Sequence, residues 1–199
     1  MPGSLLSLVF PRACIGCDRD GFLLCADCGQ SVGQSQTIQI GELRAVAALP
    51  YAELLKDAIV EFKRGRRAFA SDLAALVERF VTPDVTLVPI RTTRKRRAER
   101  GFDQTVLLAN ILQRRCGVGV LDVLTRHGNI AQHGRSRSER LASTGRFAAR
   151  SGSVASRGRL VLFDDVRTTG ATLLDAAEAL REAGFGVTSA LTLAWTPKE

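Results

Sequence analysis

The sequence lacks the long apolar runs that a membrane protein needs. It contains no stretch of roughly eighteen or more apolar residues, the length that a membrane-spanning helix requires. The stretch 5–10 is apolar but short. It has neither a basic leader nor a small-residue cleavage site, so we do not expect a secretory signal peptide. These absences favour a cytoplasmic protein with no membrane span.

Three common phosphate-binding motifs are also missing. No lysine stands where a Walker A loop requires one, and the dinucleotide fingerprint G-x-G-x-x-G is absent from the predicted strand–helix junctions. Haloacid-dehalogenase phosphatases need D-x-D after an apolar strand, but here Val166 stands in the place of the second aspartate. The two histidines, His127 and His133, lie in a polar stretch and are interpreted as surface residues, not as catalytic bases.

Basic residues are in excess. The 28 lysines and arginines outnumber the 20 acidic residues and give a net charge of +8. Such an excess favours a polyanionic partner, which could be a phosphorylated small molecule, a nucleic acid or an acidic surface. An arginine-rich proteome would give the same charge without any such partner, so the charge alone does not choose.

The apolar periodicity predicts an α/β fold. Strands are predicted at 44–49, 85–90, 118–124, 160–163 and 186–194, and helices at 51–63, 71–80, 103–115 and 171–183. Strands that alternate with helices imply a mostly parallel sheet with helices on both faces. The stretch 29–36 has the composition of a linker. We therefore predict two parts, a small N-terminal module over 1–40 and an α/β domain over 41–199.

Four of the five cysteines form two C-x-x-C pairs, Cys14 with Cys17 and Cys25 with Cys28. Four thiolates that converge tetrahedrally on Zn²⁺ leave no open position, which is typical of a structural site. Disulfides or a redox dithiol are the alternatives, and a reducing compartment disfavours both. The fifth, Cys116, is interpreted as an ordinary buried thiol.

The segment 160–172, LVLFDDVRTTGAT, holds the strongest signal for function. In an open parallel sheet, ligands bind beyond the carboxyl ends of the strands, where this segment places Asp164 and Asp165. The turn that follows offers threonine hydroxyls, backbone N–H groups and a helix N-terminus, which together suit a phosphate. A ribose 5-phosphate satisfies both features, with its phosphate in the turn and its hydroxyls on the acids.

This segment resembles the phosphoribosyl-diphosphate motif of type I phosphoribosyltransferases. The order of segments along the chain is similar to that of the ComF family, which is associated with competence for DNA uptake. It runs from a cysteine-pair module through the basic segment 62–67 and the segment 100–104 to the motif. Asp103 stands where the family usually has asparagine. In the loop 126–145, Arg135 and Ser143 depart from the family's usual leucine and asparagine, and these departures concern the pocket of the second substrate.

The resemblance implies a type I phosphoribosyltransferase-like fold and transfer chemistry at ribose C1, with diphosphate leaving and Mg²⁺ bound to the diphosphate and ribose hydroxyls. Asp164 and Asp165 would form the catalytic centre by holding the ribose. The acceptor, a base or an amine, cannot be read from the sequence. Thr168 to Thr172 would anchor the 5-phosphate. The residues of this segment expected to bind the substrate are Val166, Arg167, Thr168, Thr169, Gly170, Ala171 and Thr172.

A basic cluster follows the predicted strand 85–90, and it comprises Arg91, Arg94, Lys95, Arg96, Arg97 and Arg100. If that strand neighbours the motif strand, the cluster faces the same ligand edge and can neutralise a diphosphate or a nucleic acid backbone. Arg91 and Arg100 are the residues we expect on the diphosphate. The loop 126–145 resembles the lid of this superfamily, and Arg137 and Arg140 are expected to reach the ligand when it closes.

A binding module is the competing interpretation. Such a protein would keep the phosphoribosyl-binding fold but handle single-stranded DNA, or join a competence-machinery protein, without turnover. The cysteine pairs and the surplus of arginine favour this alternative, whereas the intact pair Asp164-Asp165 favours ligand binding. An oligomer is compatible with either.

Overall fold

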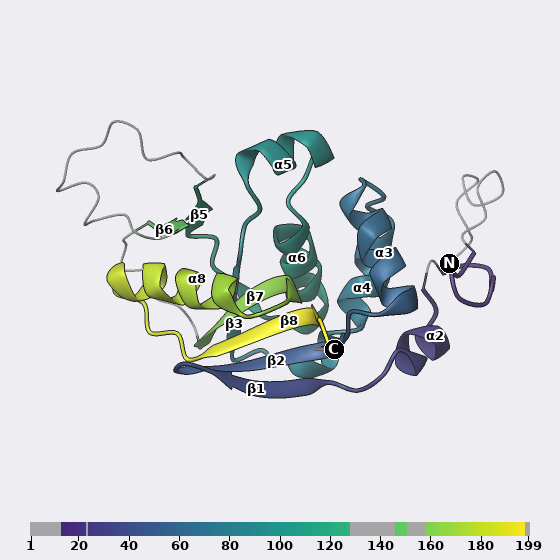
Figure 1. Ribbon diagram of the computed structural model, residues 1–199, viewed down its shortest axis with the longest axis horizontal. Coiled ribbons are helices and arrows are strands. Elements are labelled where there is room, and N and C mark those ends of the chain that lie inside the picture. The colour runs from purple at the N-terminus through teal and green to yellow at the C-terminus, as the bar shows by residue number, and fades with distance from the viewer. Residues whose placement is uncertain (1–12, 23, 128–145, 151–157, 198–199) are drawn as a thin grey trace.

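A six-stranded sheet, in the order β1-β2-β8-β7-β3-β4, runs through the computed structural model (Figure 1). The structure describes residues 13–22, 24–127, 146–150 and 158–197. The strands are β1 (Gln36–Ile40), β2 (Leu43–Pro50), β3 (Val85–Pro89), β4 (Gly119–Val120), β7 (Arg159–Arg167) and β8 (Ser189–Trp195). β1 is antiparallel to β2, and the other pairs are parallel, as the alternation of strands and helices predicts.

One face of the sheet is covered by α3 (Glu53–Lys63), α4 (Phe69–Ala75) and α6 (Gln104–Cys116). In α3 the apolar residues recur at helical spacing, and Leu55, Ile59 and Phe62 are fully buried against this face. The burial of such a stripe supplies most of the stability of a short helix. These helices form one layer of the main core with the sheet.

The other face is covered by α8 (Ala171–Glu182) and by a two-stranded antiparallel sheet of β5 (Leu124–Arg126) and β6 (Phe147–Ala149). Leu173 and Leu180 of α8 and Phe147 of β6 pack with the central residue Leu162 of β7. Within the described ranges, no helix is both long enough and apolar enough to cross a membrane.

Four predicted elements differ from the structure. The helix predicted at 71–80 is α4 followed by a 3₁₀ turn, Glu78–Phe80, and the strand predicted at 118–124 is divided between β4 and β5. The basic stretch after β3 is not a loop but the helix α5 (Arg94–Arg100), because Thr93 accepts a hydrogen bond from the Arg96 N–H and caps it. The motif strand continues to Arg167 instead of ending at Phe163.

The N-terminal module packs on the α3–α4 side of the molecule. It contains α2 (Ala26–Ser31), and Leu24 donates its backbone N–H to the carboxylate of Asp72 in α4 at 3.2 Å. β1, which the sequence did not predict, pairs with β2 and so extends the sheet into the stretch before residue 41. The division at residue 40 stays a prediction.

Candidate functional site

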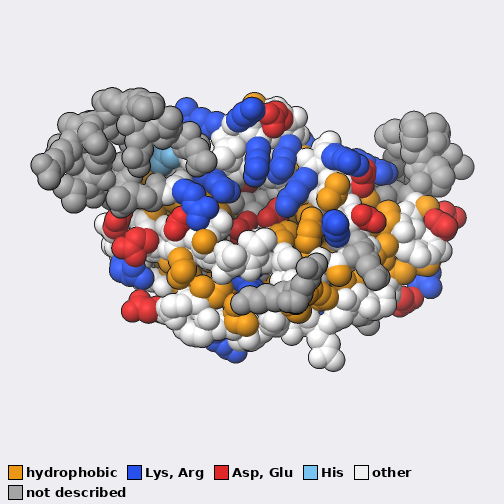
Figure 2. Space-filling view, viewed as in Figure 1, with side chains coloured by type: hydrophobic (Ala, Val, Ile, Leu, Met, Phe, Trp, Pro, Cys, Tyr) orange, Lys and Arg blue, Asp and Glu red, His pale blue; other side chains and the backbone are white. Residues whose placement is uncertain are grey.

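The carboxyl ends of β3 and β7 lie side by side, because these two strands pair in parallel from Val85 with Arg159 to Pro89 with Phe163. The strand before the basic cluster therefore neighbours the motif strand, which is what placing the cluster at the ligand edge requires. The loop and helix after β3 and the acid pair of β7 meet at the same edge of the sheet. Ligands bind at such an edge in open α/β sheets. In Figure 2, basic side chains gather over the region of α5 and α3, and acidic side chains lie in the hollow below them.

The two acids of the motif follow one another near the carboxyl end of β7, and both are half-buried. Asp165 is reached from the α3 side, because its Oδ2 lies 2.8 Å from Nζ of Lys63, the last residue of α3. The adjacent acids thus meet a cation that comes from a distant part of the chain.

Burial raises the pKa of the Asp164 carboxyl well above its ordinary value, and the negative charge of Asp165 raises it further. The N–H of Asp165, which donates to Oδ1 of Asp164 at 2.8 Å, lowers this pKa, as do the charges of Lys63 and Arg126. The Oδ1 of Asp165 accepts from the N–H of Val166 at 2.7 Å. Both carboxylates are therefore oriented by the backbone of their own strand.

The threonine turn connects β7 to α8 and is open to solvent. Thr168 and Thr169 are exposed, and Thr172 in the first turn of α8 is half-buried. Gly170 is the N-cap residue of α8 with φ 87°, and a Cβ at this position would lie 2.6 Å from Cδ1 of Ile40. Only glycine combines this left-handed conformation with so close a neighbour.

One donor of the turn is already engaged, since the N–H of Ala171 donates to Oγ1 of Thr169 at 3.4 Å. This distance is long for such a bond, so the N–H can exchange this partner for a better acceptor. The helix N-terminus, the two exposed hydroxyls and the close backbone make the turn a suitable place for an anion.

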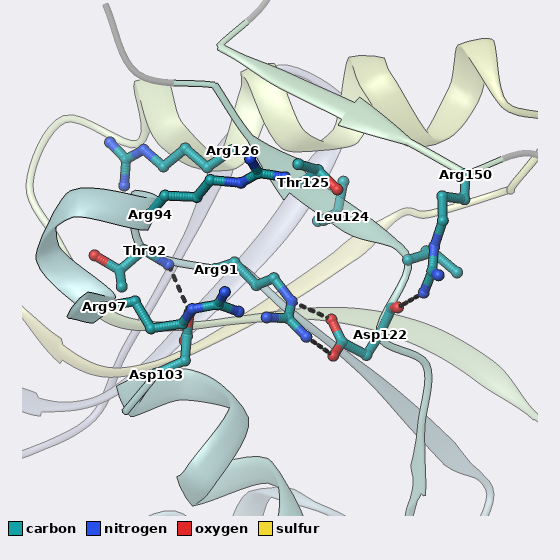
Figure 3. A pocket seen from close by; sticks show the side chains of 11 residues that line it. Arg91, Thr92, Arg94, Arg97, Asp103, Asp122, Leu124, Thr125, Arg126 and Arg150 are labelled. Atoms are coloured by element: carbon teal, nitrogen blue, oxygen red, sulfur yellow. Dashed lines mark hydrogen bonds and ion pairs between the residues drawn. The ribbon is translucent and has the colours of Figure 1, made fainter. Parts of the chain in front are cut away.

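The basic residues after β3 line a cavity of about 220 Å³ (Figure 3). Its arginines are supplied by the loop after β3, by α5 and by the β5–β6 hairpin with the residue that follows it. They are Arg91, Arg94, Arg97, Arg126 and Arg150. Arg91 is engaged by Asp122 through two hydrogen bonds, one of them 2.6 Å from Nε, and Arg150 donates to the carbonyl of Asp122.

Asp103 lies in the wall of this cavity and is buried. It occupies the N-cap position of α6, but its carboxylate makes no capping bond to that helix. Instead it accepts from the Thr92 N–H at 3.1 Å and from the Thr105 hydroxyl at 3.0 Å. Burial raises the pKa of Asp103, while these two donors and the charge of Arg91 lower it. Asp103 therefore shapes the loop that follows β3.

The structure separates the other predicted ligand residues. Arg167 is buried and donates to Oε1 of Gln36 in β1, so it is not exposed at the turn. Val166 is half-buried and packs on the main core. Arg100 ends α5 and does not line the cavity described above. Arg137 and Arg140, as well as most of the predicted lid, lie outside the described residues.

The sequence alone indicates no role for Lys63, Arg126 or Arg150. Lys63 belongs to the basic segment 62–67, and nothing in its spacing indicates a partner in β7. Arg126 is the first residue of the predicted lid, and Arg150 follows its end. Their common cavity depends on the antiparallel pairing of β5 with β6, which brings the two flanks together.

The four paired cysteines come together as the spacing predicts. Their sulfur atoms all lie within 4.8 Å of one another, and none forms a disulfide. The Sγ atoms of Cys17 and Cys25 are 3.7 Å apart. A tetrahedral site with Zn–S bonds of about 2.3 Å has S–S edges of about 3.8 Å. The cluster thus has the dimensions and the donor set to bind a metal such as zinc.

Backbone donors prepare this cluster for a metal. The N–H of Cys25 donates to Sγ of Cys14 at 3.3 Å, and the N–H of Cys28 donates to Sγ of Cys25 at 3.5 Å. Burial raises the pKa of Cys14, but the backbone donors outweigh it and lower this pKa to about 6. Hydrogen bonds with Cys17 and Cys25 raise the pKa of Cys28 to about 12, because a thiolate there would adjoin the others. A bound cation would remove this mutual repulsion.

Two bacterial competence proteins are similar to this chain in sequence. The chain is 38% identical over 141 residues to "Competence protein ComFC" of Bacillus subtilis strain 168, a match that covers 67% of this chain and 56% of that protein. It is 30% identical over 143 residues to "Competence protein ComFC" of Streptococcus pneumoniae strain R6, covering 69% and 62%. The matches thus span little more than half of each relative. No family model matches the chain.

Among solved structures, the chain is similar to an allosteric regulatory enzyme of purine biosynthesis, with 19% identity and a TM-score of 0.41 over 62% of this chain and 24% of that one. It is also similar to the UMP synthase of Leishmania donovani, with 18% identity and a TM-score of 0.36 over 64% and 22%. Both TM-scores are below 0.5.

Proposed function

Since this chain is a ComF-type protein, we propose that it works as a phosphoribosyltransferase. It binds phosphoribosyl diphosphate together with Mg²⁺ and transfers the phosphoribosyl group to a base or an amine. The observation that carries this proposal is the meeting of three features at one edge of the sheet. They are the acids of β7, the open turn that caps α8, and the arginine-lined cavity after β3.

The turn takes the 5-phosphate. Its exposed hydroxyls on Thr168 and Thr169 and the backbone N–H groups at the start of α8 are all donors, and the helix terminus adds a partial positive charge. Gly170 lets the backbone come close to the ligand because it has no side chain. No lysine is needed in such a turn, which suits a singly substituted phosphate.

The acids take the ribose. Carboxylate oxygens accept hydrogen bonds from hydroxyls but repel phosphate, so the sugar belongs between the turn and the cavity. Asp164 and Asp165, each oriented by a backbone N–H, hold the ring. Their negative charge also stabilises the positive charge that develops on the ribose in an oxocarbenium-like transition state.

The cavity takes the diphosphate. Arg94, Arg97 and Arg126 place three guanidinium groups around a space of about 220 Å³, and Arg91 is held at its wall by Asp122. Charge-assisted bonds from arginine suit a diphosphate, which carries several negative charges and leaves in the reaction. Mg²⁺, when bound to the diphosphate oxygens that this hard cation prefers, supplies further neutralisation of the leaving group.

The N-terminal module holds a structural Zn²⁺ through Cys14, Cys17, Cys25 and Cys28, since four thiolates leave no coordination position for a substrate. Free thiols and a metal site of this type suit a reducing compartment, which is the basis for proposing a cytoplasmic location.

Calorimetry tests ligand binding directly. Phosphoribosyl diphosphate is titrated into the wild type with Mg²⁺ present, and into Asp165→Asn and an exposed control, Asp57→Asn. We expect binding by the wild type and the control, and a loss of about tenfold or more in affinity for Asp165→Asn. Absence of heat from the wild type would end the proposal. Diphosphate release across a panel of bases and amines then tests transfer and identifies the acceptor.

A second candidate function, handling of single-stranded DNA, is favoured by the exposed side of α5. Lys95 and Arg96 are exposed and do not line the cavity, so the proposed diphosphate contacts do not use them. Basic surfaces of this kind bind nucleic acid backbones. The double variant Lys95→Ala/Arg96→Ala should lower the affinity for single-stranded DNA and leave phosphoribosyl diphosphate binding unchanged. Equal DNA affinity of variant and wild type across a salt series would remove this candidate.

A further inference from the structure

The acid pair has a basic partner from a distant part of the chain. Nζ of Lys63, the last residue of α3, lies 2.8 Å from Oδ2 of Asp165. The two side chains are only 26% and 18% exposed. The ion pair is therefore partly shielded from water, and its geometry matters more than that of a freely exposed pair.

The end of α3 is held firmly at the point where Lys63 leaves it. Phe62 is fully buried, and its ring centroid lies 5.2 Å from that of Phe102. The guanidinium of Arg67 lies over the Phe102 ring, 4.9 Å from its centroid, and donates to the Gly101 carbonyl. The segments 62–67 and 100–104 are thus joined, and their junction fixes the backbone of Lys63.

Arg64 and Arg66, the neighbours of Lys63 in the segment 62–67, have an acidic partner of their own, whereas Lys63 pairs with Asp165. The nearest acid in sequence, Glu61, is occupied by Arg64 at 2.8 Å and by Arg66 at 3.3 Å. Both arginines lower the pKa of Glu61 through their hydrogen bonds. Arg64 and Arg66 therefore pair with Glu61 of their own segment, and Lys63 pairs with Asp165 of β7.

The negative charges of Asp164 and Asp165 explain why an ion pair with Lys63 matters for ligand binding. Two adjacent carboxylates repel each other and would repel a ligand that carries phosphate groups. Two cations offset this repulsion: Lys63 forms an ion pair with Asp165, and the charges of Lys63 and Arg126 both act on Asp164. Asp165 uses Oδ1 for the Val166 N–H and Oδ2 for Lys63, so its carboxylate plane is fixed by two contacts. Lone pairs remain on both oxygens for hydroxyl donors.

We propose that Lys63 is a positioning residue of the ribose site: its ammonium fixes the Asp165 carboxylate and supplies the counter-charge that lets the acid pair accept ribose hydroxyls beside a bound phosphate. The inference rests on the proposed function and deepens it, because it assigns sugar recognition to a residue outside the motif. Lys63 acts through Asp165 and leaves the phosphate turn untouched. Its removal therefore weakens recognition of the sugar but not of phosphate.

The test compares ribose 5-phosphate with inorganic phosphate by calorimetry on the full chain. In the wild type the ribose should add affinity over phosphate alone. Lys63→Met should lower the affinity for ribose 5-phosphate about tenfold, the effect of losing one charge-assisted contact. The affinity for inorganic phosphate should stay within about twofold. Lys63→Arg, which keeps the charge, should recover most of the loss.

The matched control is Lys56→Met, because Lys56 is exposed on the same helix. It should behave as the wild type. Equal losses of affinity for both ligands in Lys63→Met would mean that Lys63 has only a structural role. Tighter binding of ribose 5-phosphate in Lys63→Met would mean that Lys63 blocks the site. Either result overturns the inference while the proposed function stands. If the wild type binds neither ribose 5-phosphate nor phosphoribosyl diphosphate, the proposed function fails and the inference fails with it. Thermal unfolding of each variant shows whether it is folded.

Discussion

The cysteine cluster and the edge of the sheet that carries Asp164 and Asp165 are two places in the described chain where polar side chains gather, and they are built differently. In the cluster, four sulfur atoms converge on one point and backbone N–H groups donate to two of them. At the edge, Asp164 and Asp165 are half-buried neighbours on one strand, and Thr168 and Thr169 beyond them are exposed. The cluster is closed around a space for one ion, whereas the edge is open to a larger ligand.

The difference shows how the stability and the function of this protein are divided. Converging donors from a short stretch would be held together by a metal, so a metal bound there would contribute to folding. Charged groups that meet from distant elements are incompletely compensated, which is tolerated where a ligand completes them. Changes in the cluster should therefore affect stability first, and changes at the edge should affect binding first.

Removal of the metal should have the largest effect. We expect Cys14→Ser to lose bound zinc and to lower the unfolding midpoint by roughly 10 °C or more, since a structural zinc site contributes several kcal/mol. Zinc content by mass spectrometry and thermal unfolding are the two measurements. Cys116→Ser is the control, because this cysteine lies outside the cluster. If the wild type as purified contained no zinc and unfolded at the same midpoint as Cys14→Ser, the cluster would not be a structural metal site and the comparison would fail.

Gly170 should give the next largest effect, because it serves both stability and the turn. Gly170→Ala places a side chain at φ 87° and against Ile40, so we expect a loss of about 1–3 kcal/mol in the free energy of unfolding. Denaturant unfolding measures this, and calorimetry with inorganic phosphate measures the turn.

Gly186→Ala is the control for this glycine, since nothing lies within 4 Å of a Cβ at that position. It should leave phosphate binding unchanged. Unaltered phosphate affinity in Gly170→Ala would show that the close backbone approach is not needed and would argue against the phosphate turn.

The cavity arginines should affect binding with little effect on stability. Arg97→Ala is expected to weaken binding of phosphoribosyl diphosphate about tenfold, because one charge-assisted contact is lost. The unfolding midpoint should stay near that of the wild type, since Arg97 is exposed. Lys95→Ala is the control on the same helix and does not line the cavity. The same loss in both variants would indicate a diffuse charge effect instead of a built cavity.

The smallest effect should be a pH-dependent one at Asp164. Its folded pKa is raised by burial and by Asp165, so the native state binds a proton that the unfolded state has released. Stability linked to this group therefore increases as the pH falls from the raised value towards the ordinary value of 3.8 and is lost as the pH rises. Asp164→Asn has no such proton.

We therefore expect Asp164→Asn to be more stable than the wild type at neutral pH and to lose this advantage at acid pH, as measured by urea unfolding at several pH values. Asp57→Asn is the exposed control. An advantage that does not change with pH would show that the Asp164 carboxyl is not destabilised by its surroundings.

Much of the edge could be predicted from local patterns. The strand of the motif, the start of α8 and the buried strand β3 follow from apolar runs and from glycine and threonine in the turn. The end of β7 could not be predicted, because Asp164, Asp165 and Arg167 are polar and are typical of a strand end. The strand continues because its backbone still pairs with buried β8, up to Arg167 with Trp195.

Two other differences have different causes, one local and one tertiary. The residues of α5 are mostly good helix formers, and Thr93 is a good N-cap, so the signal for this helix was present but was outweighed by the density of positive charge. The break between β4 and β5 has no such signal. It occurs where Asp122 turns to pair with Arg91, a contact between residues that only the folded chain brings together.

The sequence by itself determined the ligand chemistry, namely four thiolates at metal spacing and an acid pair followed by a threonine turn. Short-range order was enough for these features, because their donors are neighbours along the chain. Only the tertiary structure decided which cations serve the acids and how the arginines surround a cavity. Lys63 and Arg126 reach the end of β7 from different layers, and such partners are chosen by the packing of helices and hairpin on a sheet.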